Sequence, residues 1–295
     1  HLDLLAHFKL QFSLLLGIGI AWLMLIRSRH LLRLGLVFLS LNLIEVLPWY
    51  LPTALNMSGW SQALLPASVA KPQASFRSEM KVVLANMLFS NQQVEPLRQL
   101  IRNSAPDLVV LQEGNAGHLA VMAEFKSKLP YHFRARNLPY GLAVWSRYPI
   151  SAPQLLLLGE EELPSLSGKL HLGHRVITLF TTHLTSPIRK PSINRNRQLA
   201  AVTDYLGSHR DTDLVLGDFN VSMWSPFYRQ LERQSGFNNC RKGFGVLPSW
   251  PSQLPAWARI PIDQCLTGTG LQVSDFQLGP KLGSDHLPLL ITLRV

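Results

Sequence analysis

The sequence predicts an α/β domain that follows a hydrophobic helical hairpin. Strongly apolar residues gather at the amino end, and the remainder alternates short β-branched runs with segments of helical spacing. The 295 residues are 47% hydrophobic but only 16% charged, with a mean hydropathy of +0.12. This composition excludes a disordered chain, a collagen and a disulfide-stapled mini-protein, and it disfavours an ordinary cytosolic enzyme.

Residues 1–52 carry the excess hydrophobicity, since 33 of these 52 residues are apolar or aromatic. Leu10–Ile26 contains no charged residue, and a second apolar stretch, Leu31–Leu51, is interrupted only by Arg33 and Glu45. The first stretch is at the short end for a bilayer core of about 30 Å, but Lys9 and Arg27 at its ends can snorkel and lengthen the span, so both stretches are candidates for transmembrane helices. Two buried core helices are the alternative, but the later sequence offers no comparably apolar partner for them. A cleaved signal peptide is disfavoured because two runs occur and neither leads to a small-residue cleavage site.

The short connection between the two apolar stretches predicts the orientation in the membrane. It carries Arg27, Arg29 and Arg33, and the positive-inside rule assigns such a connection to the cytoplasm. We therefore expect a membrane protein whose later domain lies outside the cytoplasm; the resemblance described below implies the bacterial inner membrane and thus a periplasmic or extracellular domain. Residues 53–78 are rich in Pro, Ser, Ala, Asn and Gln and are predicted to be a linker.

Residues 79–295 are enough for one α/β domain with its own core. Strands are predicted where apolar, β-branched residues form short runs, over Lys81–Ala85, Leu108–Leu111, Gly141–Trp145, Val176–Thr181, Leu214–Leu216, Ile262–Leu266 and Leu287–Leu293. Helices are predicted from spacing of about 3.6 residues over Val94–Asn103, Ala116–Lys128 and Arg195–Leu206.

Polar residues follow these strands in a regular way. LVVLQ is followed directly by Glu113, TLFTT by His183, and LVLG by Asp218, with Asn220 two residues later. Asp263 and the pair Asp285-His286 accompany the last two strands. Because strand ends in an α/β sheet gather at one rim, these side chains are expected in one ligand site. Carboxylates, amides and histidines without cysteine suit a hard cation such as Mg²⁺ or Mn²⁺, and such an ion suits phosphate-ester hydrolysis.

The same motifs carry a family resemblance. VVLQEG, TTHL, LVLGDFN, PIDQCL and GSDHLP occur in the order typical of the endonuclease/exonuclease/phosphatase, or DNase I-like, superfamily. That superfamily includes DNase I-like nucleases, AP endonucleases, neutral sphingomyelinases and inositol phosphatases. The similarity runs from about residue 81 to residue 295, and the hairpin-plus-linker layout resembles a membrane-anchored bacterial branch. It implies a four-layer α/β sandwich of two mixed sheets flanked by helices.

The resemblance also implies a metal site. Asn86 and Glu113 would hold Mg²⁺ or Mn²⁺, with Asp285 contributing directly or through water. One departure is IDQ at Asp263, where many members have IDH, so Gln264 is the atypical residue.

The remaining motif residues would perform the chemistry. Asp218 would orient or activate the attacking water, and Asn220 would bind the phosphoryl oxygens. His286 would pair with Asp263, which selects its tautomer, and would act as base or phosphate clamp. His183 would contact the phosphate or assist the leaving group.

A basic run near the start of a predicted helix gives a further candidate. Arg195, Asn196 and Arg197 could bind substrate phosphate at the helix amino terminus, beside Arg189 and Lys190. A solvated helix end is at least as good an interpretation.

Trp224 and Trp250 could stack bases or line a lipid-facing rim, although tryptophan is more often a core residue. Cys240 and Cys265 could form a disulfide outside the cytoplasm.

The net charge of the later domain only weakly distinguishes nucleic-acid substrates from lipid substrates. Residues 53–295 hold 24 Lys and Arg against 16 Asp and Glu, which favours polyanions or an anionic membrane surface. We therefore expect a membrane-anchored, metal-dependent phosphodiesterase, in the first place a nuclease acting on DNA or RNA. The alternatives are a phospholipid or sphingolipid headgroup phosphodiesterase or inositol-phosphate phosphatase, and a catalytically silent binding module. The expected partners are the phosphodiester substrate and the lipid bilayer, with no protein partner implied.

Overall fold

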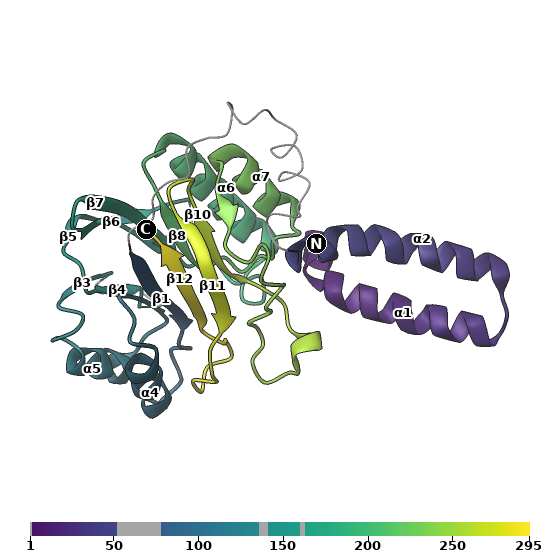
Figure 1. The fold of residues 1–295 in the computed structure, drawn as a ribbon, viewed down its shortest axis with the longest axis horizontal. Helices are drawn as coiled ribbons and strands as arrows, with labels where there is room; N and C mark the ends of the chain where they lie inside the picture. Colours follow the sequence, from purple (N-terminus) through teal and green to yellow (C-terminus); the bar gives the residue numbers. More distant parts are fainter. Residues whose placement is uncertain (1, 52–77, 136–140, 160–162) are drawn as a thin grey trace.

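The computed structural model describes residues 2–51, 78–135, 141–159 and 163–295. Within these ranges an α/β domain is joined to a pair of long helices that project from one side of it (Figure 1). Apart from residue 78, the predicted linker 53–78 lies outside the described residues.

The α/β domain contains two six-stranded sheets. The first, called here sheet A, has the strand order β11-β12-β1-β2-β4-β3, and the second, sheet B, has the order β5-β6-β7-β8-β10-β9. In sheet A the bounds are β1 Glu79–Asn86, β2 Leu108–Gln112, β3 Tyr131–Arg134, β4 Ala143–Ser146, β11 Gln272–Leu278 and β12 Leu289–Arg294. In sheet B they are β5 Ile150–Leu157, β6 Pro164–Leu172, β7 Arg175–Thr182, β8 Leu214–Asp218, β9 Asn238–Asn239 and β10 Asp263–Thr267.

Each sheet is mixed, with one central parallel pair. The pair is β1 with β2 in sheet A and β7 with β8 in sheet B, while the other neighbours run antiparallel. A parallel pair requires a crossover connection, and the crossover helices are α4 (Glu95–Ser104) and α6 (Ser192–Ser208). The predicted helical segments beginning at Val94 and at Arg195 lie in these two helices.

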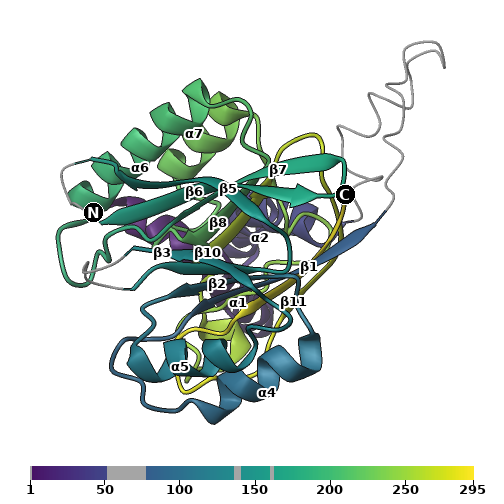
Figure 2. The same cartoon turned by 90° about the vertical axis from the view of Figure 1, so that its left-hand side faces the viewer.

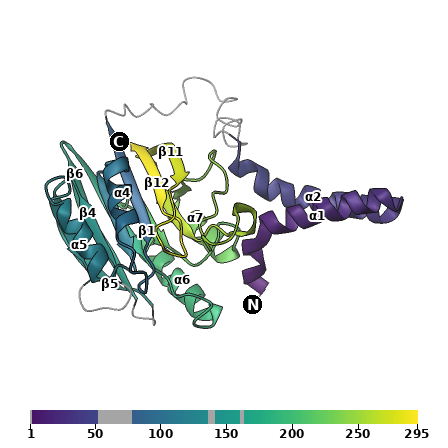
Figure 3. The same ribbon diagram turned by 90° about the horizontal axis from the view of Figure 1, so that it is seen from below.

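The sheets pack face to face, and helices cover their outer faces (Figures 2 and 3). Helices α4 and α5 (Ala116–Glu124) lie on sheet A, and α6 and α7 (Pro226–Ser235) lie on sheet B. The predicted four-layer sandwich is confirmed.

Strand β1 illustrates how the sequence produces these layers. Val82 and Leu84 pack in the core between the sheets, whereas Val83 and Ala85 pack in the core beneath α4 and α5. Successive side chains of a strand point to opposite faces, so a strand buried on both faces is apolar at every position. This is why KVVLA is a continuous apolar run rather than an alternating one.

Several elements were not predicted from the sequence, among them β3, β5, β6, β11 and α7. Strands β3, β5 and β11 are edge strands, and β5 has largely exposed or half-buried side chains. Such strands carry few consecutive apolar residues, so their sequences lack the signal that identified the central strands.

The amino-terminal segment forms the predicted helical hairpin. A 3₁₀ turn η1 (Leu2–Phe8) leads into α1 (Lys9–Leu25), and α2 (Arg29–Val46) returns to a second 3₁₀ turn, η2 (Leu47–Trp49). Two helical stretches, Asp3–Leu25 and Arg29–Trp49, are long and apolar enough to cross a membrane, with mean hydropathies of 1.7 and 1.8. Most of their large apolar side chains are exposed, so the domain itself does not bury them.

The base of the hairpin is attached to sheet B's helical layer. Val46 and Trp49 belong to the same core as α6 and α7, and the Trp224 indole donates a hydrogen bond to the Glu45 carbonyl at 3.1 Å. Glu45 also forms ion pairs with Lys9 at 2.9 Å and Arg229 at 3.4 Å. Trp224 is therefore a buried contact to the hairpin and not a residue of an open rim.

Cys240 and Cys265 form a disulfide, with their Cα atoms 5.4 Å apart. It joins strand β10 to the residue that follows β9. This resolves the pairing that the sequence left open.

Candidate active site

The carboxyl ends of the two parallel pairs meet between the sheets. Gln112, at the end of β2, connects them: its amide nitrogen donates to the Thr182 carbonyl at 2.7 Å, and its carbonyl accepts from the Asp218 backbone amide at 2.8 Å. A single buried amide thus aligns the end of sheet A with the ends of β7 and β8 in sheet B. This explains the glutamine of the VVLQEG motif, to which the sequence analysis gave no role.

A cavity of about 570 Å³ opens where these strand ends meet. The predicted site residues that line it are Glu113, His183, Asp218, Asn220, Asp285 and His286. Asn86 lies directly behind them, since its amide contacts Glu113 at 3.5 Å and Asp218 at 3.2 Å. Asp263 lies behind His286. The structure therefore brings together all eight residues predicted for catalysis and metal binding.

Asp218 lies at the centre of this group. Its Oδ2 atom is 3.2 Å from the Asn86 amide nitrogen and 3.6 Å from the Nε2 atoms of both His183 and His286. Its Oδ1 atom accepts the backbone amide of Asn220 at 2.8 Å. Burial raises the pKa of Asp218 to about 8, because removal from water disfavours the charged form more than His286 favours it.

The glycine before Asp218 is required by close packing. A Cβ atom at Gly217 would lie 1.8 Å from the Thr182 carbonyl oxygen, so any other residue would push β8 away from β7. Asn220, two residues after Asp218, has a positive φ of 50°, and Glu113 has one of 53°. Non-glycine residues in this region are uncommon and cluster at functional sites.

His286 and Asp263 form a buried pair. The His286 Nδ1 atom is 2.9 Å from the Asp263 Oδ2 atom, which also accepts the Ser249 hydroxyl at 2.5 Å. Burial disfavours a charged His286, but Asp263 and Asp218 together outweigh this and raise its pKa to about 10. The pKa of Asp263 is lowered: burial opposes ionisation, but His286 and the hydrogen bonds from His286 and Ser249 prevail. Ser249 was not predicted from the sequence, because a lone serine in a loop carries no signal.

The GSDHLP motif is attached to the end of β1 through its serine. The Ser284 hydroxyl donates to the Asn86 carbonyl at 2.7 Å and accepts the His286 amide at 3.1 Å. This side chain holds Asp285 and His286 of the loop before β12 against the site.

The oxygen-rich side of the cavity suits a hard cation. Glu113 is buried, and its carboxylate is contacted by the Asn86 amide, by the Phe89 backbone amide at 3.3 Å and by His183 at 3.7 Å. Glu113 offers a carboxylate, and Asn86 offers one amide oxygen, which here accepts the Leu88 backbone amide at 3.1 Å. Both are ligand types that Mg²⁺ and Mn²⁺ prefer. Asp285 is half-buried on the cavity wall, where its Oδ2 accepts the Trp250 indole N–H at 3.0 Å.

A second group could also hold an ion by its spacing alone. Asp218, Asp263 and His286 offer ligand atoms that all lie within 4.8 Å of one another. However, Asp263 is already engaged by His286 and Ser249, so its negative charge is balanced by its neighbours. The Asn86 and Glu113 side of the cavity is therefore the better fit for a metal.

The three residues predicted to bind substrate phosphate do not line the cavity. Arg195 and Asn196 are buried and both bond to Asp3 of η1, at 2.5 and 3.2 Å, while Arg197 is exposed. Arg189 and Lys190, from the same basic run, do line it. Phosphate binding by Arg195, Asn196 and Arg197 stays a prediction, and this arrangement gives it no support.

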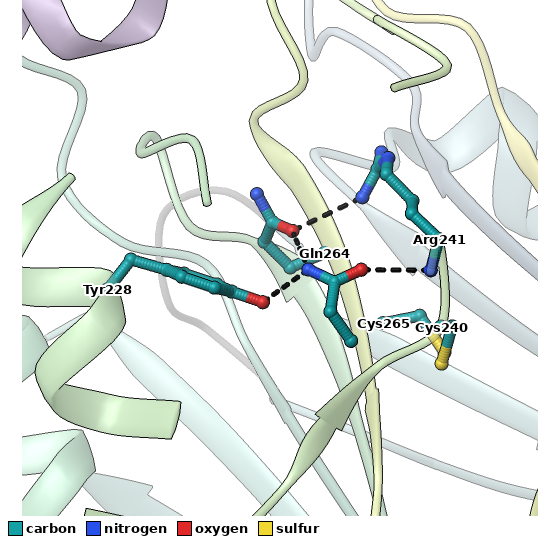
Figure 4. The surroundings of a disulfide bond; sticks show 6 residues. Tyr228, Cys240, Arg241, Gln264 and Cys265 are labelled. Carbon is teal, nitrogen blue, oxygen red and sulfur yellow. Dashed lines mark hydrogen bonds between the residues drawn. A yellow bond between two sulfur atoms is a disulfide. The ribbon is translucent and has the colours of Figure 1, made fainter. Parts of the chain in front are cut away.

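The atypical Gln264 has a structural function. Its amide nitrogen donates to the carbonyls of Val221 and Pro261 at 2.8 and 2.9 Å, and its carbonyl accepts Arg241 at 3.2 Å. Figure 4 shows Gln264 between Tyr228 and Arg241, beside the disulfide. It therefore ties β10 to the segment after Asn220.

Trp250 and the η1 segment complete the wall of the cavity. Leu4, His7 and Phe8 line it from η1, opposite Trp250 and Ile260. A rim position for Trp250 was one interpretation of the sequence. The contribution of η1 was not predicted, because the apolar pattern of residues 1–52 indicated only a membrane anchor.

A two-sheet sandwich whose strand ends bring carboxylates, amides and two histidines into one cavity defines a class, the phosphoric ester hydrolases of DNase I-like fold. The sequence profile of the Endonuclease/Exonuclease/phosphatase family matches residues 83–286, and the chain belongs to this family. A search of curated proteins finds no match.

Solved structures share the fold. D. rerio TDP2 complexed with single-strand DNA product is 16% identical, with a TM-score of 0.64, and the match covers 74% of this chain and all of that one. The human Nocturnin catalytic domain with bound sulfate is 17% identical, with a TM-score of 0.60 over 74% and 94% of the two chains. Sphingomyelinase C from Streptomyces griseocarneus is also 17% identical, with a TM-score of 0.54 over 73% and 99%.

Proposed function

We propose that this protein is a membrane-anchored, divalent-metal-dependent phosphodiesterase with an anchor in residues 1–52, a linker over 53–78 and a catalytic domain in 79–295. The observation that carries the proposal is the convergence of Glu113, His183, Asp218 and His286 on one cavity, with Asn86 and Asp263 directly behind them. Residues of these types, in such proximity, can bind a phosphoester, hold a cation and move a proton.

In the proposed mechanism Asn86 and Glu113 hold Mg²⁺ or Mn²⁺, with Asp285 contributing at the cavity wall. The metal supplies Lewis-acid stabilisation of charge that develops on the phosphoryl oxygens. Within family members such ions are generally required, and the buried carboxylates here are consistent with this requirement.

The other residues orient and exchange protons. Asp218 orients the attacking water and takes up the proton that the water loses, since its carboxylate accepts hydrogen bonds at the centre of the site. His286, held by Asp263, and His183 contact the phosphate or transfer a proton to the leaving group. Asn220 binds a phosphoryl oxygen in the transition state.

The membrane anchor is supported by the hairpin. Helices α1 and α2 expose many large apolar side chains, and Arg27 and Arg29 lie at the tip of the hairpin, away from the domain. The positive-inside rule then favours a cytoplasmic tip and a periplasmic or extracellular domain. The bacterial inner membrane is proposed only from the resemblance to a membrane-anchored bacterial branch of the family. A reporter fused after Val295 should be active only outside the cytoplasm, and cytoplasmic activity would overturn this orientation.

Two substrate classes are supported by different observations. The net positive charge of residues 53–295 supports a nuclease that acts on DNA or RNA. The cavity supports a lipid headgroup instead, because its apolar wall includes Leu4 and Phe8, which lead directly into α1. The geometry favours the lipid headgroup, since a phosphoester at the membrane surface would lie beside this wall.

The test is a substrate panel with the full-length protein in nanodiscs and Mg²⁺ or Mn²⁺. The panel contains plasmid DNA, RNA, sphingomyelin, phosphoinositides and bis(4-nitrophenyl) phosphate. Turnover that is lost on chelation and in Asp218→Ala or His286→Ala supports the proposed enzyme. Lipid turnover without nucleic-acid turnover selects the lipid enzyme, and the reverse selects the nuclease. Ligand binding without any turnover would favour a silent binding module and overturn the proposal.

A further inference from the structure

The η1 segment is built into the catalytic domain as well as into the hairpin. His7 is only 4% exposed, and its Nδ1 atom accepts the backbone amide of Ser222 at 3.1 Å. The Ser222 hydroxyl lies 2.9 Å from the same ring nitrogen. Ser222 is two residues beyond Asn220, so η1 contacts the segment that carries a proposed phosphate-binding residue.

A buried arginine makes the second connection. Arg195 on α6 is fully buried, and its guanidinium donates to the Asp3 carboxylate at 2.5 Å and to the backbone carbonyl of Asn220 at 2.7 Å. Asn196 supports the arrangement, accepting from the Arg195 guanidinium at 2.7 Å and donating to Asp3 at 3.2 Å. The planar guanidinium holds Asp3 and Asn220 at a defined spacing, which a lysine could not do.

Asn220 needs such support because of its backbone. Its φ of 50° is uncommon for a non-glycine residue, and its side-chain amide is directed by a hydrogen bond to the Leu184 carbonyl at 2.8 Å. An unusual conformation persists only where the surroundings over-determine it. Arg195 at the carbonyl of Asn220 and His7 at the amide of Ser222 supply two of these surrounding contacts.

We propose that Asp3, His7 and Arg195 are positioning residues for Asn220, so that the segment preceding the hairpin is part of the catalytic unit. The proposal rests on the proposed function for the kinetic role of Asn220. Its structural part, that η1 holds the 219–222 segment in place, does not depend on any activity.

Contacts at the hairpin base provide a matched control. Glu45 pairs with Lys9 and Arg229, and it also connects the hairpin to the domain. Asp3 contacts Arg195, whereas the contacts of Glu45 within the described residues include neither Arg195 nor Asn220. Glu45→Gln therefore weakens the attachment of the hairpin without touching the proposed positioning network.

The first experiment measures hydrogen–deuterium exchange in the full-length protein in nanodiscs. Asp3→Asn and His7→Ala should accelerate exchange at least about tenfold in peptides covering residues 219–223, because the contacts that restrain these amides are lost. Glu45→Gln should leave these peptides unchanged. Unchanged exchange in both Asp3→Asn and His7→Ala would overturn the proposal, whatever the activity of the protein.

The second experiment measures hydrolysis of bis(4-nitrophenyl) phosphate with the same preparations. Asp3→Asn should lower kcat about tenfold with KM changed less than about twofold, and Asp3→Glu should restore part of the loss. In an Asn220→Ala background, Asp3→Asn should cost less than about twofold, because both changes remove the same function. An equal loss in both backgrounds would mean a general loss of folded protein and would overturn the positioning role.

The outcomes also separate this proposal from the proposed function. If Asn220→Ala is fully active, the role given to Asn220 is wrong even when the exchange result holds. If Asp3→Asn unfolds the protein, Arg195→Lys and His7→Ala repeat both measurements with smaller disruptions. Full activity and unchanged exchange in these two variants would also overturn the proposal.

Discussion

The two sheets contribute different chemistry to the same cavity. Sheet B supplies Asp218 and Asp263, which are 1% and 2% exposed and are surrounded by protein hydrogen-bond donors and His286. Sheet A supplies Glu113, whose contacts are one backbone amide, one side-chain amide and a more distant histidine. The negative charge of Asp263 on sheet B is therefore balanced by His286 and Ser249, whereas that of Glu113 on sheet A is the better placed to take up a cation. We therefore propose that the carboxylates of sheet B serve proton transfer and that Glu113 of sheet A serves metal binding.

The largest expected effect is that of Asp218→Asn, because Asp218 contacts groups from both sheets. Loss of the residue that orients the attacking water should lower kcat by about 10³-fold. Steady-state hydrolysis of bis(4-nitrophenyl) phosphate at saturating metal measures it. Asp211→Asn, an exposed aspartate paired with Lys169 on the same sheet, is the control and should stay near wild-type activity. A loss below tenfold in Asp218→Asn would remove it from the centre of the mechanism.

The next effect concerns the pair formed by Asp263, on β10 of sheet B, and His286, in the loop before β12. Asp263→Asn should lower kcat about 10²-fold, because His286 loses the carboxylate that selects its tautomer and favours its charged form. Ser249→Ala removes one hydrogen bond to Asp263 and should cost clearly less. If Asp263→Asn instead weakened metal binding as strongly as it lowered kcat, the division of labour between the sheets would be wrong.

The same pair predicts a pH dependence of stability in the metal-free protein. The pKa of His286, about 10 in the folded protein, exceeds its unfolded value, so its stabilisation is complete below about pH 6.5 and is lost as the pH rises through about 10. Between pH 8 and pH 10 the free energy of unfolding should fall by about 1 kcal/mol per pH unit at most. Chemical unfolding in EDTA should show this slope in the wild type and a shallower one in Asp263→Asn. Equal slopes would contradict the proposed interaction.

Glu113→Gln tests sheet A. It should weaken Mg²⁺ or Mn²⁺ binding at least about tenfold, with kcat partly restored at high metal concentration. Calorimetric titration of the metal gives the affinity, and Glu124→Gln, on the exposed surface of α5, is the matched control. Unchanged affinity in Glu113→Gln would transfer the metal to the Asp218 and Asp263 side.

Arg197→Ala should have the smallest effect. Arg197 is exposed and does not line the cavity, so kcat and KM should change less than about twofold. Lys190→Ala, at a position that does line the cavity, should raise KM for an anionic substrate more. A large effect of Arg197→Ala would restore the phosphate-binding role predicted from its position near the helix start.

The central strands and the residues after them were predictable from the sequence because their signals are local. A strand buried on both faces is apolar at every position, and the polar residue that ends it marks the rim of the sheet. Glu113, His183 and Asp218 were found in this way. Gln112 was seen as part of a motif, but its bonds to Thr182 and to Asp218 cross between the sheets and leave no local pattern.

The edge strands and the wall of the cavity were not predicted from the sequence, for different reasons. Strand β5 is largely exposed and contains a proline, so its sequence resembles a loop. The apolar residues of the η1 segment have two locations in the structure, since the segment leads into α1 and also lines the cavity. Hydropathy alone cannot distinguish an apolar residue of a membrane anchor from one in the wall of a cavity.

The order of residues along this chain is enough to establish an α/β catalytic domain, a hairpin with its arginines at the tip, and a set of oxygen and imidazole side chains at strand ends. These properties follow from periodicity, charge and local motifs. The partner of each buried charge depends on tertiary packing. Arg195 appeared as one cation of a basic run, yet burial next to Asp3, 192 residues away, makes it an internal ion pair. Desolvation disfavours a buried guanidinium, and the Asp3 carboxylate offsets this cost at Arg195. The fold alone decides which carboxylate that is.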